Sequence, residues 1–215
     1  MAIGANNIGI KNMAKEASGR CPYFTPTKEF SNILESTRER HDDIKNTLKS
    51  HIESQGFQCE EEFNIVLDTK QPNAITIKGR ADLRCVKDQK HIILEIKSSY
   101  IDRGKAMDLY QAYLYGRLYK SIHGVEPIVI TVYRPPRYEK RQTTQEKVVN
   151  INDIKLPANF IYIRIDISKD WIKIDEILSA RGGGIYIIGS DCYNCVNNQC
   201  PIMAGLQKYS TQLPP

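Results

Sequence analysis

The chain has 215 residues, a formal net charge of +5 and a mean hydropathy of −0.43. This length allows one domain with a real hydrophobic core, and the hydropathy argues against an integral membrane protein. The mild positive charge suits a nucleic-acid partner but does not establish one. Residues 1–20 contain no apolar stretch typical of a secretory signal, so we expect a cytoplasmic protein without a membrane partner.

The first strong pattern is an amphipathic helix over residues 30–54. Its apolar residues recur at helical spacing and predict a core-facing stripe, formed by Ile33, Ile44, Leu48 and Ile52. His41 falls on the same stripe, one turn before Ile44. A histidine there is either a satisfied core residue or a ligand that points into a site.

Strands and helices then alternate along the chain. The patterns predict strands at 61–68, 74–86, 91–99, 126–133 and 159–167, and helices at 102–124 and 170–184. In the second strand, Ile77, Ala81 and Cys85 are expected on one face. This order predicts a mixed α/β fold whose central sheet is flanked by helices. We expect one domain over 21–200, with an N-terminal segment at 1–20 and a tail at 201–215.

The predicted hairpin at 74–99 brings two acids together. If residues 87–90 form the turn, Val86 pairs with His91, and counting outward places Asp82 directly opposite Glu95. Opposed residues have Cβ atoms roughly 5 Å apart, where like charges are destabilising. A divalent cation shared by the two carboxylates would remove the conflict. Lys97 lies on the same face as Glu95, because alternate residues of a strand point the same way.

Such a group can do phosphodiester chemistry. A metal held by carboxylates polarises a phosphodiester and lowers the pKa of bound water, while a lysine orients that water or stabilises charge on the phosphate. His41 is a candidate additional ligand. The alternative is a strand face with charges exposed to solvent.

These residues resemble a known nuclease core. Gly79–Asp82 reads GRAD and Glu95–Lys97 reads EIK, a pattern similar to the PD-(D/E)xK nucleases. The following helix carries QAYLY, in which Gln111 and Tyr115 match the QxxxY motif of the RecB-like branch. These two residues lie one helical turn apart and project together.

The resemblance assigns roles to individual residues. It implies that Mg²⁺ or Mn²⁺ is bound by one imidazole, two carboxylates and one main-chain carbonyl, which are His41, Asp82, Glu95 and Ile96. Lys97 takes the role of the catalytic lysine. Gln111 and Tyr115 lie beside the site.

Four of the six cysteines are placed to share a metal group. The segment DCYNCVNNQC has the spacing C-x2-C-x4-C, and one more cysteine lies near the other end of the chain; the set is Cys21, Cys192, Cys195 and Cys200. Four thiolates can hold a [4Fe–4S] cluster or a tetrahedral Zn²⁺. The third alternative is unligated core cysteines. A bound cluster would join the two ends of the domain, which predicts a structural role.

The two remaining cysteines are expected to be unpaired. A reducing compartment disfavours disulfides, and Cys85 falls on the apolar face of its predicted strand. We therefore expect Cys85 to be a core residue and give Cys59 no role.

Nuclease motifs with one early and three late cysteines resemble the CRISPR-associated exonucleases of the fourth Cas family. The resemblance runs from Cys21 to Cys200 and implies a metal-dependent exonuclease that cuts single-stranded DNA from the 5′ end. It implies CRISPR adaptation proteins as partners and leaves a homo-oligomer open. Similar nucleases of archaeal viruses would act in replication or recombination.

Two other functions remain open at this stage. A non-catalytic DNA-binding scaffold would keep the fold, although intact motifs count against it. A structure-specific endonuclease would share the hairpin without explaining the cysteines. Contacts to DNA are expected from basic and aromatic residues at 133–141, which are Tyr133, Arg134, Arg137, Tyr138, Lys140 and Arg141. The alternative for that segment is an ordinary solvated loop.

Overall fold

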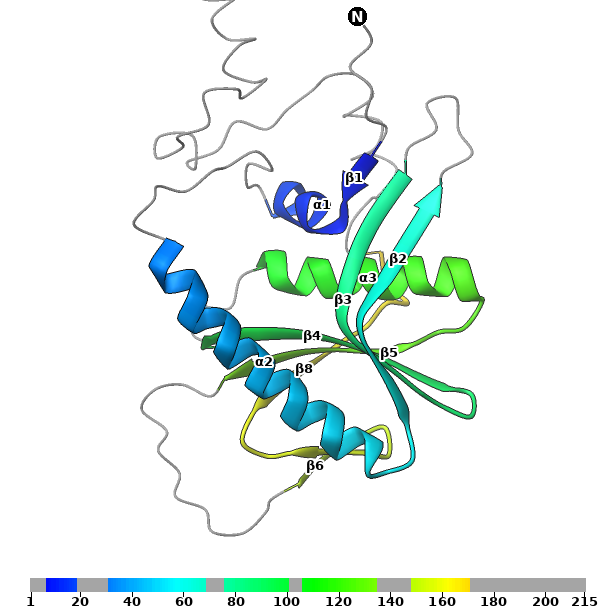
Figure 1. Ribbon diagram of the computed structural model, residues 1–215. Helices are drawn as coiled ribbons and strands as arrows, with labels where there is room; N and C mark the ends of the chain where they lie inside the picture. Colours follow the sequence, from blue (N-terminus) through cyan, green and yellow to red (C-terminus); the bar gives the residue numbers. More distant parts are fainter. Residues whose placement is uncertain (1–6, 19–30, 69–75, 101–105, 135–147, 171–215) are drawn as a thin grey trace, which may run out of the picture.

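The structure is a computed structural model that describes residues 7–18, 31–68, 76–100, 106–134 and 148–170. Within these ranges the elements follow the order β1–α1–α2–β2–β3–β4–α3–β5–β6–β7–β8 (Figure 1). The predicted helix at 170–184 and most of the basic loop that follows Arg134 lie outside the described residues. No helix in the described ranges is both long enough and apolar enough to cross a membrane.

The central sheet is mixed, as predicted. Its six strands are β1 (Asn7–Gly9), β2 (Gln58–Asp68), β3 (Thr76–Lys87), β4 (Lys90–Tyr100), β5 (Ile128–Arg134) and β8 (Ile161–Ile165). Strands β4 and β5 are parallel and are connected through helix α3 (Ala106–His123), whereas β3–β4 and β5–β8 are antiparallel. The order β1–β3–β4–β5–β8 places the predicted hairpin β3–β4 at the centre.

Helices cover both faces of this sheet and enclose two hydrophobic cores. One core lies under α1 (Ile10–Ala17) and α3; the other lies under α2 (Ser31–Glu53) and the two-stranded hairpin β6 (Val148–Ile151)–β7 (Ile154–Pro157) (Figure 1). The predicted stripe of α2 is confirmed for Ile44, Leu48 and Ile52, which are all buried in the second core. Three tyrosines of α3 are buried in the first core, and Tyr110 packs against it; the buried ones are Tyr113, Tyr115 and Tyr119.

The N-terminal segment contains structure that the sequence analysis set apart from the domain. Strand β1 pairs in parallel with β3, so that Gly9 lies beside Lys78. Helix α1 follows at once and buries Ile10, Met13 and Ala14 against α3. These three residues are spaced three and four apart, as on the buried face of an amphipathic helix. The sequence therefore contained a helical pattern here, but only over a short segment.

The register of the central hairpin is as predicted, although its turn is shorter. Val86 pairs with His91, and the same register continues to Leu83 and Leu94. Lys87 and Lys90 also pair, which leaves two residues in the turn instead of four. Asp88 takes a positive φ of 53° there, a conformation that aspartate tolerates better than most residues.

Strands β2 and β3 bend together just before β3 begins to pair with β4. Their ladder runs to Glu61 and Leu83 and resumes at Phe63 and Ala81, and Glu62 has a φ of 53°. The residues predicted to share one face of β3 are all buried, but Ile77 and Ala81 enter one core and Cys85 enters the other. Ala81 packs with α1 and α3, whereas Leu83 packs with α2, because the bend turns the strand between them.

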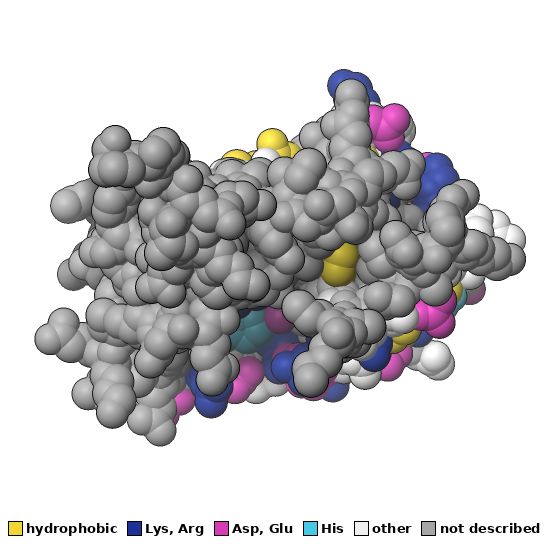
Figure 2. Space-filling view, turned by 90° about the horizontal axis from the view of Figure 1, so that it is seen from above, with side chains coloured by type: hydrophobic (Ala, Val, Ile, Leu, Met, Phe, Trp, Pro, Cys, Tyr) yellow, Lys and Arg dark blue, Asp and Glu magenta, His cyan; other side chains and the backbone are white. Residues whose placement is uncertain are grey.

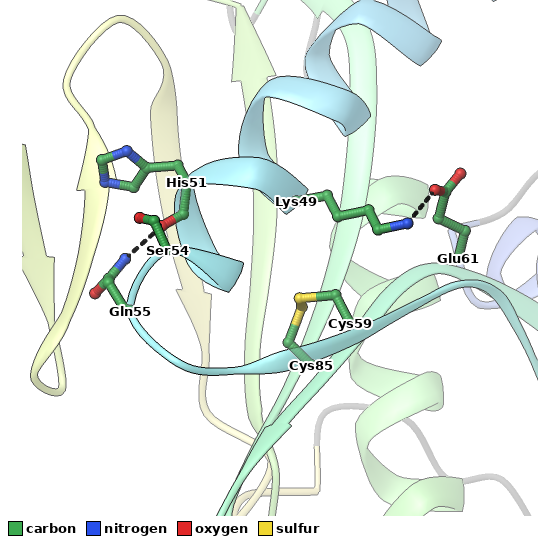
Figure 3. Close-up of a disulfide and its surroundings, with 7 residues drawn as sticks. All are labelled: Lys49, His51, Ser54, Gln55, Cys59, Glu61 and Cys85. Atoms are coloured by element: carbon green, nitrogen blue, oxygen red, sulfur yellow. Dashed lines mark hydrogen bonds and ion pairs between the residues drawn. A yellow bond between two sulfur atoms is a disulfide. The ribbon is translucent and has the colours of Figure 1, made fainter.

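Cys59 and Cys85 form a disulfide, contrary to the expectation that both are unpaired. They face each other across β2 and β3, with Cα atoms 4.1 Å apart (Figure 3). Directly opposed residues of an antiparallel pair come close enough for such a bond. The expectation that Cys85 is a core residue is confirmed, since its side chain is fully buried.

Candidate active site

The structure brings all the predicted non-cysteine site residues to one cavity of about 870 Å³. They come from α2, β3, β4 and α3, and they are His41, Asp82, Glu95, Ile96, Lys97, Gln111 and Tyr115. Side chains of α3 reach both strands of the hairpin there, since Gln111 contacts Lys97 of β4 and Tyr115 contacts the backbone of β3. In Figure 2 a histidine side chain lies next to acidic and basic side chains where the surface is hollowed. Cys21, Cys192, Cys195 and Cys200 lie outside the described residues.

Asp82 is held by two groups from other elements. The backbone N–H of Ile96 donates to Asp82 Oδ2 at 2.6 Å. Nε2 of His41 lies 3.3 Å from the same oxygen. The hydrogen bond with Asp82 raises the pKa of His41, and it outweighs the opposing effect of burial. The imidazole and the carboxylate therefore contact each other at the wall of the cavity.

Glu95 is the most deeply buried acid of the cavity, with 3% of its surface exposed. Lys97 Nζ donates to Glu95 Oε1 at 2.6 Å, whereas Oε2 is buried and has no hydrogen-bond partner among the described residues. Burial raises the pKa of Glu95 to about 7, although the charge of Lys97 acts in the opposite direction. A buried carboxylate oxygen without a partner is costly and marks a place where a cation would be stabilised.

A chain of hydrogen bonds ties Lys97 to the QxxxY motif. Lys97 Nζ donates to Gln111 Oε1 at 3.1 Å, and Gln111 Nε2 donates to the hydroxyl of Tyr115 at 3.2 Å. That hydroxyl donates in turn to the carbonyl oxygen of Arg80 at 2.7 Å. Burial raises the pKa of Tyr115, so it remains a neutral donor. The motif therefore orients the lysine and anchors α3 to β3.

Sequence reasoning missed Asp108, which is also part of this site. Asp108 is buried, and its Oδ1 lies 3.6 Å from Lys97 Nζ, while Oδ2 accepts a hydrogen bond from Tyr133 at 3.3 Å. Burial lowers the pKa of Lys97, but attraction to Glu95 and Asp108 outweighs it and the pKa is raised. Asp108 precedes Gln111 by one helical turn, a spacing that could have signalled its position.

Tyr133 was expected to contact DNA, and the structure corrects this. Only 1% of its surface is exposed, because β5 is the second strand from the edge and is covered on both faces. Its hydroxyl reaches Asp108 instead. Arg134 is partly exposed, and the rest of the expected segment lies outside the described residues.

Gly79 of the GRAD sequence allows the helix to approach the strand. A Cβ at this position would lie 2.7 Å from Cε1 of Tyr115 and 2.4 Å from Cδ1 of Ile10. Both distances are far below van der Waals contact, so no larger residue fits without movement. The glycine thus lets Tyr115 reach the backbone of β3.

The described residues contain no group of three or more His, Cys, Asp or Glu side chains arranged to hold one metal ion. Two basic groups already stand beside the carboxylates: the imidazole of His41 beside Asp82, and the ammonium of Lys97 beside Glu95. The set of donors, one imidazole and two carboxylates with one oxygen unpartnered, still suits a divalent ion.

Comparisons with known proteins give information about the fold alone. No protein-family model matches the chain, and no curated protein matches it. The solved crystal structure of SSO0001 is similar, with a TM-score of 0.54 and 17% sequence identity over 94% of this chain and 89% of that chain. A likeness at this identity supports the mixed α/β architecture.

Proposed function

We propose that the protein is a metal-dependent DNA nuclease of the PD-(D/E)xK, RecB-like type. The observation that carries this proposal is the composition of one cavity. Two carboxylates on adjacent strands, a partly buried lysine and a glutamine–tyrosine pair converge there, and Glu95 Oε2 has no partner in the described part of the chain. This is the set of groups that metal-assisted phosphodiester hydrolysis needs.

The residues present fit a divalent metal. His41, Asp82, Glu95 and the carbonyl of Ile96 would hold Mg²⁺ or Mn²⁺, which when bound supplies Lewis acidity and lowers the pKa of a coordinated water. Burial disfavours the charged form of Glu95, and a bound cation would offset that cost. His41 would exchange its contact with Asp82 for a ligand bond as a neutral imidazole.

Lys97 supplies the electrostatic part of the chemistry. Its ammonium carries more donors than the contacts to Glu95 and Gln111 use, so it can also donate to a phosphate oxygen as negative charge develops. Gln111 fixes the ammonium from the side of α3, and Asp108 keeps it charged. The lysine is thus oriented before the substrate arrives, which reduces the reorganisation needed during reaction.

The finer parts of the proposal rest on the resemblance to the CRISPR-associated exonucleases. These parts are cleavage of single-stranded DNA from the 5′ end, a structural [4Fe–4S] cluster on the four cysteines, and a role in spacer acquisition or in viral recombination. Visible absorbance of the purified protein separates a cluster from zinc, because zinc sites are colourless.

The proposed activity is tested by digestion of single-stranded DNA labelled separately at the 5′ and 3′ ends, with Mn²⁺ or with EDTA. Lys97→Ala is run beside Lys155→Ala, which removes an exposed lysine on β7. We expect metal-dependent release of short 5′-labelled products, reduced at least about a hundredfold in Lys97→Ala and unchanged in Lys155→Ala. A folded protein that binds DNA but cuts none would instead support the scaffold function.

A further inference from the structure

We propose that β1, the first turn of α1 and the start of β3 form a subsite for a phosphate group of the nucleic-acid strand. This subsite lies in the same cavity as the carboxylates and Lys97, so the inference rests on the proposed function. It assigns a role to the N-terminal segment, which the motifs do not include. The phosphate bound there is a neighbour of the one that is cut.

Basic side chains gather on this part of the cavity. Lys11, Lys78 and Arg80 all line it and are all exposed. Lys78 and Arg80 are two residues apart on β3 and therefore share a face. Gly9 pairs with Lys78 across β1 and β3, which brings the start of α1, with Lys11, alongside these cations.

The guanidinium of Arg80 is oriented by an acid. Arg80 Nε lies 2.6 Å from Glu62 Oε2, and the other oxygen of Glu62 accepts from Lys45 Nζ at 3.2 Å. The side chain of Arg80 is 64% exposed. A guanidinium has five N–H donors, more than the contact of Nε with one carboxylate uses, so an exposed Arg80 can also donate to a phosphate.

The first turn of α1 adds backbone donors. Gly9 is the N-cap residue and makes no side-chain cap, and the first turn contains no acidic residue. The first N–H groups of a helix lack intrahelical partners and carry partial positive charge, which favours an anion. Gly9, Ile10 and Lys11 line the cavity.

The position of the phosphate that is cut comes from the proposed function. Glu95 Oε2, which the proposed function assigns to the metal, is buried in the same cavity without a partner among the described residues. A DNA strand that places one phosphate at Asp82 and Lys97 carries its neighbouring phosphates one nucleotide away on either side. Those neighbours need cations, and the cavity supplies them on β3 and α1.

The first test measures binding of a fluorescent single-stranded oligonucleotide in EDTA at several salt concentrations. Lys11→Ala/Lys78→Ala is compared with Lys155→Ala/Lys169→Ala, which removes two exposed lysines outside the cavity. Each lost phosphate contact makes the slope of log K against log salt shallower by about 0.7. Because the subsite holds one phosphate, we expect the slope to change by about 0.7, and the binding to weaken, for the cavity pair only. Identical slopes in the two double variants would overturn the proposal.

The second test separates binding from folding. Gly9→Asp and Gly9→Asn both place a good N-cap residue at a position whose φ of −77° accepts side chains, but only aspartate adds negative charge. We expect equal melting temperatures and an affinity about tenfold lower for Gly9→Asp than for Gly9→Asn. Equal affinities would exclude a phosphate at this helix end.

Two further comparisons identify the phosphate and keep the proposals apart. If Gly9→Asp weakens binding only of oligonucleotides with a 5′ phosphate, the subsite holds the terminal phosphate; an equal effect on 5′-hydroxyl oligonucleotides assigns it to an internal one. All these measurements avoid cleavage. If the protein cuts no DNA but shows the expected slopes, the proposed nuclease function is refuted and the phosphate subsite is supported.

Discussion

Reduction of the Cys59–Cys85 bond should destabilise the protein without removing any contact of the sheet. The bond closes a loop of 26 residues that contains the bend and most of β2 and β3. The entropy of closing such a loop in the unfolded chain corresponds to about 3.5 kcal/mol at 25 °C. Because the two residues are directly opposed on paired strands, the reduced thiols can stay in place, and the loss should come mainly from the unfolded state.

The assay is urea unfolding with and without a thiol reductant. With a slope of about 2 kcal/mol per molar urea, the midpoint should fall by about 1.7 M on reduction. Cys59→Ala/Cys85→Ala is the matched control, because it retains the other four cysteines and cannot form this bond. Its midpoint should not respond to the reductant. A fall of the same size in the control would place the effect at the other cysteines. A fall below about 0.4 M in the unaltered protein would refute the loop argument.

Three further changes test the site. Gly79→Ala should cost about 1–3 kcal/mol of stability by overpacking, measured as melting temperature. It should also lower the cleavage rate, because the added methyl group displaces Tyr115. An unchanged cleavage rate would contradict the role of that contact. Asp108→Asn keeps the side-chain shape but removes a carboxylate beside Lys97, so we expect about a tenfold lower kcat and an alkaline limb of the pH profile shifted to lower pH. An unshifted limb would make Asp108 merely structural. Cys195→Ser should abolish visible colour and lower the melting temperature, and a colourless unaltered protein would exclude the cluster.

The fold explains why the acids can stand together before any metal binds. Lys97 forms an ion pair with Glu95, His41 lies beside Asp82, and Ile96 adds a backbone donor to Asp82. Glu95 Oε2 is buried and has no hydrogen-bond partner in the part of the chain that the structure describes. The cost of bringing the two acids together is thus partly offset in advance, and the remaining imbalance favours a cation at this oxygen.

Much of this protein is determined by short-range sequence pattern. The apolar spacing of α2 places Ile44, Leu48 and Ile52 in a core, because residues three and four apart share a helix face. The alternation in β3 and β4, with a short polar turn between them, sets a register in which Val86 meets His91. The observed ladder ends at Leu83 and Leu94, one residue short of the two acids, yet Asp82 and Glu95 line the same cavity, so their proximity could be read from the sequence.

Tertiary structure decided what depends on residues far apart in the chain. The bend at Glu62 changes which core Ala81 and Leu83 enter, and no local period reports it. Cys59 meets Cys85 only because β2 and β3 pair in one particular register. Asp108 approaches Lys97 only because α3 crosses the sheet at this point. Local pattern specifies which face of an element is buried, but the pairing of distant faces is set by the packing of the whole core.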